Sequence, residues 1–450
     1  MYKTTNYKVV DLTAPGSKSV SHRLLICAAL AKGTSRMHNL LSSEDIDCTA
    51  ECLRRLGAIT SGEKVNSVMQ VTGLSGRIYN PKPQPIDIDV RESGTTCRLL
   101  AGVISAGHGN FLLRGRGRMH SRPLLDLARA LEEQGTVFDW LEMHGCPPVR
   151  IDSRGIRGGD ITVNMDKSSQ FLSGLLLAAP LAHAPVRIHI AGEQAVSWPY
   201  VGLTLQAMHE FGVGVEIFED KQKIAGSGHA PGLKNIIPGR TSFNIFPGNY
   251  LAGDIFAEGD YSSASYLLAA GAIGSSAVRV SGLKPKPDSL QGDRVMVDIL
   301  KSMGARISLK EGCYTSCPAD LHGIEVDMGH CPDLVPTVAA TACAARGMTR
   351  VTNVGHLRLK ESDRLAALEQ ELGSAGFEVQ AGENELLING QSAQAKKIAL
   401  KTHADHRIAM SLSLLELIGF EIALDNLACV EKSYPKFWND FAKIKEANRI

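Results

Sequence analysis

The sequence lacks the features that mark membrane and secreted proteins. None of its 450 residues belongs to an apolar run of about 18 or more, the length that suggests a transmembrane helix. The first ten residues, MYKTTNYKVV, also lack the apolar core of a signal peptide. These absences predict a cytoplasmic protein with no membrane partner.

An excess of positive charge is also missing. Lys and Arg number 48 against 47 Asp and Glu, for a net charge of +1, and aromatic residues make up only 5% of the chain. A nucleic-acid surface needs clustered positive charge, and single strands are held on aromatic side chains. The composition therefore predicts no nucleic-acid partner.

Two nucleotide-binding signatures are absent as well. The chain contains neither G-x-G-x-x-G after an early strand nor G-x-x-x-x-G-K-[ST], so neither a dinucleotide nor ATP is indicated. The ten cysteines are scattered rather than clustered, which predicts reduced, buried thiols on helical faces, as at Cys48 and Cys52.

No metal site is expected. One group could be assembled into a zinc site on paper: Cys313, Cys317, His322, His330 and Cys331. Its spacing fits no common ligand pattern. His403 and His406 flank Asp405 at an expected helix start, where a cap and its neighbour account for them better than a metal does.

What the sequence does contain is one pattern that returns six times: a polar turn followed by a helix of small and aliphatic residues. The turns begin at residues 17, 93, 168, 262, 333 and 405, roughly 70 to 95 residues apart. Such a period indicates a repeated folding unit. Three repeats precede the Gly- and Pro-rich region 226–253 and three follow it, which predicts a loop or crossing there and two domains.

The polar turns also suggest a ligand. Ser, Thr and Asp are ordinary helix N-caps, so capping alone explains any single turn. Four turns, however, carry a cation in the turn or just after it: Lys18 with Arg23, Arg98, Lys167 and Arg407. A cation opposes the helix dipole at that end, whereas an anion is favoured there. The misplaced charges predict an anionic ligand.

Short strands are expected between the helices. The segments that read as strands are 68–74, 85–90, 110–115, 160–165, 186–192, 213–218, 278–283, 306–310, 349–354, 377–380 and 385–390. Strands that alternate with helices throughout a chain are typical of the α/β class.

Several motifs within residues 15–435 carry a resemblance. They are Pro15-Gly16-Ser17-Lys18-Ser19-Val20-Ser21-His22-Arg23, Ser93-Gly94-Thr95, Arg122-Pro123, Ser168-Ser169-Gln170-Phe171-Leu172, Val196-Ser197, Glu258-Gly259-Asp260, Leu359-Lys360-Glu361-Ser362-Asp363-Arg364-Leu365, Asp405-His406-Arg407-Ile408-Ala409-Met410 and Lys432-Ser433-Tyr434-Pro435. Together they resemble the enolpyruvyl transferase family.

The resemblance implies a two-domain inverted α/β fold. Each domain has three βαβαββ units whose helix N-termini face the interdomain cleft. Residues 1–17 and 258–450 are expected to form one discontinuous domain, and residues 18–257 the other.

The resemblance also implies a reaction. The enolpyruvyl group of phosphoenolpyruvate is transferred to the 5-hydroxyl of 3-phosphoshikimate, and phosphate leaves by addition and elimination. This step belongs to the shikimate pathway, which leads to chorismate and the aromatic amino acids, and glyphosate inhibits it by mimicking phosphoenolpyruvate. No cofactor or metal is implied, and we expect a monomer.

Site residues follow from the resemblance motif by motif. Those implied to bind phosphoenolpyruvate are Lys18, Gly94, Arg122, Gln170, Arg364, Arg407 and Lys432. Those implied to bind 3-phosphoshikimate are Lys18, Ser19, Arg23, Ser168, Ser169, Gln170, Ser197, Asp333 and Lys360. Asp333 is the expected base toward the 5-hydroxyl, Glu361 the acid and base at the methylene carbon, and Lys18 the group that assists phosphate departure.

Two positions depart from the family pattern. Glu92 stands where the phosphate turn usually opens with Asn, so we expect its carboxylate to point away or to pair with Arg98 or another cation. His356 stands where the family usually has Asn, four residues before Lys360. Both changes are expected to affect affinity more than reaction type.

Two other functions remain open. Family members that act on UDP-N-acetylglucosamine typically carry a cysteine in the loop that here contains Arg114–Arg122, and this chain has none between Cys97 and Cys146. A non-catalytic protein that binds anions or RNA ends could use the same repeat, but the near-neutral charge and the paired acids Asp333 and Glu361 count against it.

Overall fold

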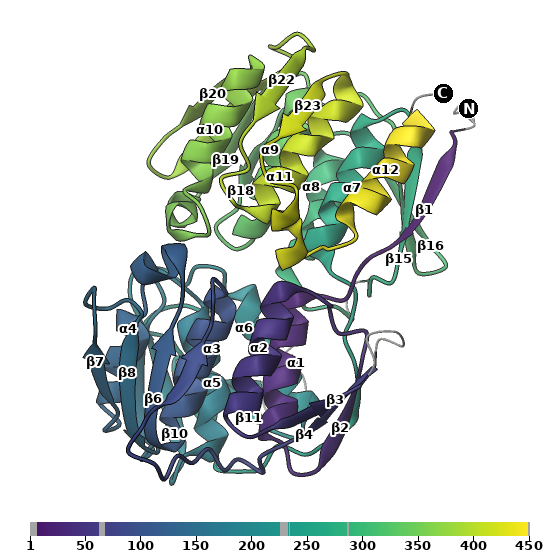
Figure 1. Ribbon diagram of the computed structural model, residues 1–450. Coiled ribbons are helices and arrows are strands. Elements are labelled where there is room, and N and C mark those ends of the chain that lie inside the picture. The colour runs from purple at the N-terminus through teal and green to yellow at the C-terminus, as the bar shows by residue number, and fades with distance from the viewer. Residues whose placement is uncertain (1–6, 63–67, 226–232, 234, 286–287, 449–450) are drawn as a thin grey trace. The chain divides into compact units, whose positions relative to one another are not determined.

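The polypeptide changes unit twice along its length. The computed structural model describes residues 7–62, 68–225, 233, 235–285 and 288–448. Unit 1 comprises Met1–Ser17 and Glu258–Ile450, and unit 2 comprises Lys18–Ala257 (Figure 1).

Unit 2 contains three sheets in its described part. Their strand orders are β14 (Asp254–Phe256), β2 (Thr34–His38), β4 (Val68–Thr72), β3 (Ile59–Ser61); β5 (Ile86–Asp89), β6 (His108–Arg114), β8 (Val149–Arg154), β7 (Val137–Trp140); and β12 (Gln222–Ala225), β11 (Val215–Glu219), β13 (Thr241–Ile245), β10 (Val186–Ala191), β9 (Gly159–Asn164). Its helices are α1 (Lys18–Leu30), α2 (Glu44–Arg55), α3 (Gly94–Ser105), α4 (Leu125–Glu132), α5 (Gln170–Ala178) and α6 (Pro199–Glu210).

Unit 1 repeats the same plan. Its sheets have the orders β1 (Val9–Thr13), β15 (Ala277–Ser281), β17 (Cys313–Cys317), β16 (Arg306–Lys310); β18 (Glu325–Asp327), β19 (Gly347–Thr352), β21 (Glu385–Gly390), β20 (Glu378–Ala381); and β22 (Lys397–Leu400), β23 (Glu421–Leu424). Its helices are α7 (Tyr261–Ile273), α8 (Met296–Ser302), α9 (Val335–Ala344), α10 (Arg364–Ala375), α11 (His406–Ser413) and α12 (Phe437–Asn448).

Each four-stranded sheet joins one parallel pair to two antiparallel strands, as in the β5–β6 pair followed by β8 and β7. Along the chain, the elements of such a repeat follow the order strand, helix, strand, helix, strand, strand. The predicted α/β repeat is therefore confirmed. Two repeats differ in the described residues: the β9 repeat has the additional strand β12, and the β22 repeat ends on α12 without the two antiparallel strands.

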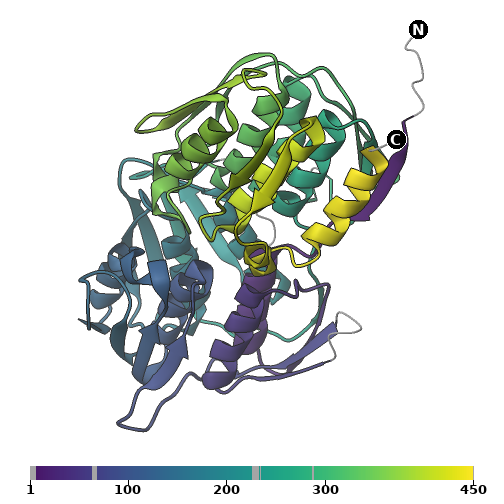
Figure 2. The same cartoon turned by 45° about the horizontal axis from the view of Figure 1, so that its top comes forward.

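The first strands of two repeats are exchanged between the units. β1 precedes α1 in sequence but pairs in parallel with β15 of unit 1. β14 precedes α7 but pairs in parallel with β2 of unit 2. Within unit 1, β1 lies beside α12, as both views show (Figure 1, Figure 2).

Each unit encloses some of its helices almost completely, while its sheets keep one face outward. In α3, eleven of the twelve residues are buried, and in α7 all residues from Tyr261 to Ala272 are buried. A helix that is apolar on all sides must be enclosed by protein. The strands instead alternate, as in β8 with its buried and exposed residues in turn, so one face of each sheet meets the core and the other meets solvent.

The region 226–253 was predicted as a loop or crossing, but part of it forms a strand. Thr241–Ile245 forms β13, which pairs antiparallel with both β10 and β11, and the chain changes unit only after Ala257. Residues 226–232 and 234 lie outside the described residues. The prediction of a loop over 241–245 was wrong because these pairings join segments distant in sequence.

Among the described helices, none is both long and apolar enough to cross a membrane. All ten cysteines are free thiols, and seven of them, including Cys48 and Cys52 on α2, are buried as expected. The prediction of burial was wrong for Cys313, Cys317 and Cys429, which are only half-buried. No group of three or more His, Cys, Asp or Glu side chains in the described chain is placed to hold a metal ion.

Close contact between α3 and α5 depends on two glycines. A Cβ atom on Gly102 would lie 2.3 Å from the carbonyl oxygen of Gly174. We expect Gly102→Ala to lower the melting temperature by roughly 3–10 °C, because overpacking costs about 1–3 kcal/mol. Differential scanning calorimetry measures this shift.

Gly202 on α6 provides the matched control. A Cβ atom there meets nothing within 4 Å, so Gly202→Ala should leave the melting temperature unchanged or raise it, since alanine favours helices. Equal losses in both variants would contradict the close-contact explanation.

Candidate active site

Three helix starts of unit 1 bring five charged side chains together. Asp333 lies in the 3₁₀ turn Pro332–Leu334 that leads into α9. Glu361 and Arg364 lie at the start of α10, whose N-cap is Asp363. Asp405 caps α11 by accepting a hydrogen bond from the backbone N–H of Arg407 at 2.9 Å.

Arg364 is the centre of this cluster. Its Nε donates to Asp405 at 2.8 Å, its Nη1 to Asp333 at 2.9 Å and its Nη2 to Glu361 at 2.9 Å. The arginine side chain is 1% exposed and Asp405 is fully buried. A planar guanidinium with five donors can serve three carboxylates at once, whereas an ammonium offers no such fork.

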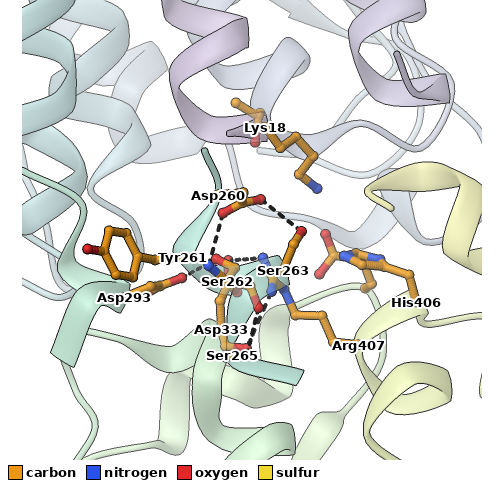
Figure 3. Close-up of polar contacts among 12 residues, drawn as sticks. Lys18, Asp260, Tyr261, Ser262, Ser263, Ser265, Asp293, Asp333, His406 and Arg407 are labelled. Carbon is orange, nitrogen blue, oxygen red and sulfur yellow. Dashed lines mark hydrogen bonds and ion pairs between the residues drawn. The ribbon is translucent and has the colours of Figure 1, made fainter. Parts of the chain in front are cut away.

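Arg407 holds the same Asp333 from a second side. Its Nη2 donates to Asp333 Oδ2 at 2.7 Å (Figure 3). Burial alone would raise the pKa of Asp333, but the positive charges of Arg407, Arg364 and Lys360 outweigh burial and hold that pKa below its ordinary value. Asp333 is therefore ionised at neutral pH.

A second buried acid lies near Asp333. Asp293 accepts a short hydrogen bond from the Ser262 hydroxyl, and Asp260 caps α7 by accepting from the Ser262 N–H at 3.0 Å (Figure 3). Burial raises the pKa of Asp293 to about 7, with further upward contributions from Asp333 and Asp260 and opposition from Arg407. The helix cap is Asp260 rather than the predicted turn residues Ser262 and Ser263, which lie in the first turn of α7.

Two more predicted site residues, Lys360 and Lys432, lie in unit 1, as does His356, which departs from the family pattern. Lys360 follows the 3₁₀ turn Gly355–Leu359, and its charge reaches Asp333. Lys432 is buried at the end of the turn Ala428–Lys432, which packs on α11. His356 is half-buried, and this burial together with the charge of Lys360 lowers its pKa to about 3. The ring is thus neutral at pH 7, so replacing the family's usual Asn adds no charge.

Unit 2 holds the other predicted residues. Lys18 begins α1, and its Nζ lies 3.2 Å from Asp45 Oδ2 on α2, with both side chains almost buried. This ion pair joins the starts of two helices. A buried cation needs such a partner, because desolvation makes an isolated charge costly.

Gly94 begins α3, and the guanidinium of Arg122 lies directly over it. A Cβ atom on Gly94 would be 2.4 Å from Arg122 Cζ. The helix start already carries unpaired N–H groups and the positive end of the dipole, so the added cation makes this turn a place for an anion. Glu92 turns instead toward the following loop, where its Oε1 would be 2.6 Å from a Cβ atom on Gly117.

Gln170 links two helix starts. Its Nε2 donates to Thr95 at 2.9 Å on α3, and its Oε1 accepts from Arg98 at 2.9 Å. The backbone N–H of Gln170 donates to Ser168 Oγ at 3.2 Å, and Ser169 is the N-cap of α5. The predicted residues of this segment therefore surround one end of α5.

Ser197 stands just before α6 with φ of 54°, and its buried hydroxyl has no hydrogen-bond partner in the described part of the chain. A buried hydroxyl without a partner is costly unless a ligand supplies one. Arg23, in contrast, is enclosed: its guanidinium donates to Thr204 at 2.7 Å and to the Ser19 carbonyl at 2.8 Å. Burial lowers the pKa of Arg23 to about 10.

The structure thus brings Asp333, Glu361, Arg364 and Arg407 into direct contact, and places Gly94 under Arg122. The motifs gave no sign of Asp293 or of the contact between Asp405 and Arg364, since the burial of an acid depends on elements distant in sequence. A capping position before α11 was the available signal for Asp405.

Comparisons with known proteins agree with one another. The family model described as EPSP synthase (3-phosphoshikimate 1-carboxyvinyltransferase) matches residues 6–242 and 238–441. The 3-phosphoshikimate 1-carboxyvinyltransferases of Vibrio vulnificus (strain YJ016) and Aeromonas salmonicida (strain A449) are 39% and 38% identical, each over 97% of this chain and 96% of the relative.

A solved structure shares the fold. The EPSP synthase from Acinetobacter baumannii superposes with a TM-score of 0.75 at 24% identity, over 97% of this chain and 96% of that one.

Asp293 should leave a signature in the pH dependence of stability. Its pKa of about 7 exceeds the ordinary 3.8, so between these values the folded chain holds a proton that the unfolded chain has lost. This contribution to stability is complete below about pH 4 and is lost as the pH rises to about 7. Asp293→Asn removes the dependence, and its melting temperature relative to the parent should rise between pH 5 and 8.

The expected change is on the order of 1–3 kcal/mol over that range. Calorimetric scans at several pH values measure it, with exposed Asp320→Asn as the control. A difference between Asp293→Asn and the parent that is constant with pH would contradict the assignment.

Proposed function

Since the chain belongs to the EPSP synthase (3-phosphoshikimate 1-carboxyvinyltransferase) family, we propose that it transfers the enolpyruvyl group of phosphoenolpyruvate to the 5-hydroxyl of 3-phosphoshikimate and releases phosphate. The observation that carries the proposal for the site is the contact of Arg364 with both expected proton-transfer residues, Asp333 and Glu361.

Phosphoenolpyruvate brings a carboxylate and a phosphate that need separate cations. In unit 1, Arg364 and Arg407 offer planar guanidinium groups that suit a carboxylate, with Lys432 near α11. In unit 2, Arg122 and the N–H groups of the Gly94 turn suit a phosphate. A pair of unit charges at about 4 Å is worth roughly 4 kcal/mol at an effective dielectric of 20, before desolvation.

Asp333 is the base toward the 5-hydroxyl. In the structure without substrate, Arg407, Arg364 and Lys360 hold its pKa below the ordinary value, which makes it a weak base. A substrate carboxylate bound to the arginines neutralises part of their charge and draws their donors from Asp333. The pKa of Asp333 then rises, so binding of the donor substrate activates the base.

Glu361 is the acid and base at the methylene carbon. Its Oε2 accepts from Arg364 Nη2, and the side chain is 14% exposed, which gives a ligand access to it. It protonates the methylene carbon during addition and removes a proton from the resulting methyl group during elimination. One carboxyl serves both steps because the second reverses the direction of transfer.

Lys18 assists the departure of phosphate. Its ammonium, paired with Asp45, lies at the start of α1, where positive charge meets the positive end of the helix dipole. A leaving phosphate gains negative charge as the bond breaks, so a fixed cation stabilises that stage more than the ground state.

The 3-phosphoshikimate side uses hydroxyl and amide groups. Its phosphate is held by the hydroxyls of Ser168, Ser169 and Ser197, and its ring hydroxyls by Asp333. The unpartnered hydroxyl of Ser197 supports this assignment. The other residues of the predicted set are Lys18, Ser19, Arg23, Gln170 and Lys360. Arg23 supports the Ser19 carbonyl from beneath rather than presenting its guanidinium at the surface.

Phosphate release from phosphoenolpyruvate tests the function. Purified protein is assayed alone, with 3-phosphoshikimate and with UDP-N-acetylglucosamine. We expect release only with 3-phosphoshikimate. Release that requires the UDP-sugar, or none with either acceptor, would refute the proposal.

Glu361→Gln tests the proton-transfer role. The amide keeps the shape of the side chain but cannot carry the proton, so kcat should fall by about 10²–10⁴ while the two KM values change by less. Steady-state kinetics measure both. Exposed Glu421, which pairs with Lys397 on β22, provides the control Glu421→Gln, for which unchanged kinetics are expected. Full activity of Glu361→Gln would remove Glu361 from the mechanism.

A further inference from the structure

A buried row of hydrogen-bonding side chains crosses the interior of unit 2. His22 Nδ1 lies 2.8 Å from Thr49 Oγ1, and Thr49 Oγ1 lies 2.7 Å from Thr96 Oγ1. Thr96 Oγ1 then donates to Ser93 Oγ at 2.7 Å. The row runs from α1 through α2 to α3, which are neighbours within unit 2 (Figure 1).

The row ends at the cap of the phosphate turn. Ser93 is the N-cap of α3 and accepts the Thr96 N–H at 3.4 Å, directly before Gly94. It also runs beside Lys18. His22 and Thr49 lie one helical turn after Lys18 and Asp45, so the two contacts form successive rungs between α1 and α2.

Every side chain of this row is buried. His22, Thr49, Thr96 and Ser93 are at most 1% exposed. The buried hydroxyl of Ser105 bonds to a carbonyl of its own helix, whereas that of Thr204 joins α6 to Ser173 on α5. Polar groups joined across three helices instead fix one arrangement of those helices, because each group left without a partner costs free energy.

The number of available hydrogens determines which group donates in each hydrogen bond of the row. Burial is the main cause that lowers the pKa of His22 to about 3, with Lys18 and Arg23 adding to it and Asp45 opposing, so the ring is neutral and carries one N–H. Thr96 uses its hydrogen on Ser93, so Thr49 donates to Thr96 and the Nδ1–H of His22 donates to Thr49. The Thr49 hydroxyl has another acceptor, the Asp45 carbonyl, but that contact is longer at 3.1 Å.

Two consequences follow from this direction. The Nε2 atom of His22 is the unprotonated one, and it has no hydrogen-bond partner among the residues that the structure describes. Thr49 and Thr96 each receive one hydrogen bond and pass one on, and Ser93 Oγ accepts from both the hydroxyl and the backbone N–H of Thr96.

We infer that His22 is a positioning residue, which acts through Thr49 and Thr96 to hold the Ser93 cap and thereby aims the first N–H groups of α3 at the phosphate of phosphoenolpyruvate. The inference rests on the proposed function of the Gly94 turn. It assigns the row to the donor substrate rather than to 3-phosphoshikimate, because the row ends at α3 and not at α5.

Thr96→Val tests the row at its middle with little change of shape. We expect KM for phosphoenolpyruvate to rise about 5- to 20-fold, the size expected from the loss of one hydrogen bond. KM for 3-phosphoshikimate should stay within about twofold, and Thr96→Ser should restore most of the affinity because it restores the hydroxyl. Ser105→Ala, at the other end of α3, is the matched control with unchanged kinetics.

An unchanged KM for phosphoenolpyruvate in Thr96→Val would overturn the inference, as would equal increases in both KM values with a lower melting temperature. If Thr96→Val does not fold, Ser93→Gly breaks the row at its end with a residue that helix caps tolerate. The same rise in KM supports the inference and its absence overturns it.

Failure of the proposed function is a separate result. A parent protein that releases no phosphate with 3-phosphoshikimate would refute the proposed function. The affinity of the same variants for inorganic phosphate, measured by titration calorimetry, would then decide the inference: a weaker Thr96→Val supports it and an unchanged one overturns it.

Discussion

The enclosure of the helices is the constraint on which the chemistry depends. Helices such as α3 and α7 are buried along nearly their whole length, so their sides must be apolar or must satisfy hydroxyls internally. Polar groups that can meet a ligand are left at the helix ends. Each helix start offers unpaired N–H groups and a positive dipole end, which suits anions. A scaffold of enclosed helices therefore concentrates anion-binding capacity at a few turns, and the repeat multiplies those turns without any need for a high net charge.

Enclosure of the helices also buries charges of both signs at their starts. Arg364 is 1% exposed and contacts Asp333, Glu361 and Asp405, an arrangement that would be costly if any partner were removed. Asp405 is fixed in its position in the cluster, because it also caps α11. Asp333 and Glu361 are partly exposed and can exchange partners with a ligand. The cluster thus combines one fixed carboxylate with two that can respond to substrate charge, and this division suits a site where protons must move only after the anions arrive.

Much of the fold could be predicted from the chain because the local signals agree with one another. Strands such as 110–115 and 385–390 are marked by branched residues and turn boundaries, and each polar turn precedes an apolar helix. The prediction failed where the structure depends on distant pairing. β13 lies in a Gly- and Pro-rich region and exists because β10 and β11 bond to it. Asp293 and the partners of His22 were invisible for the same reason: local sequence shows a polar residue, but only packing determines whether water reaches it.

The exchange of first strands affects the order in which the sheets can form while the chain is being synthesised. Unit 2 receives its last strand, β14, at residues 254–256, so all its elements have been made once that segment is synthesised. β1, at residues 9–13, has by then been waiting for a partner that is still missing, since β15 spans residues 277–281. β1 can thus pair only after all the strands of unit 2 have been made. Its shortness, and the charged Asp11 at its middle, limit the unpaired edge that it offers to other chains in the interval.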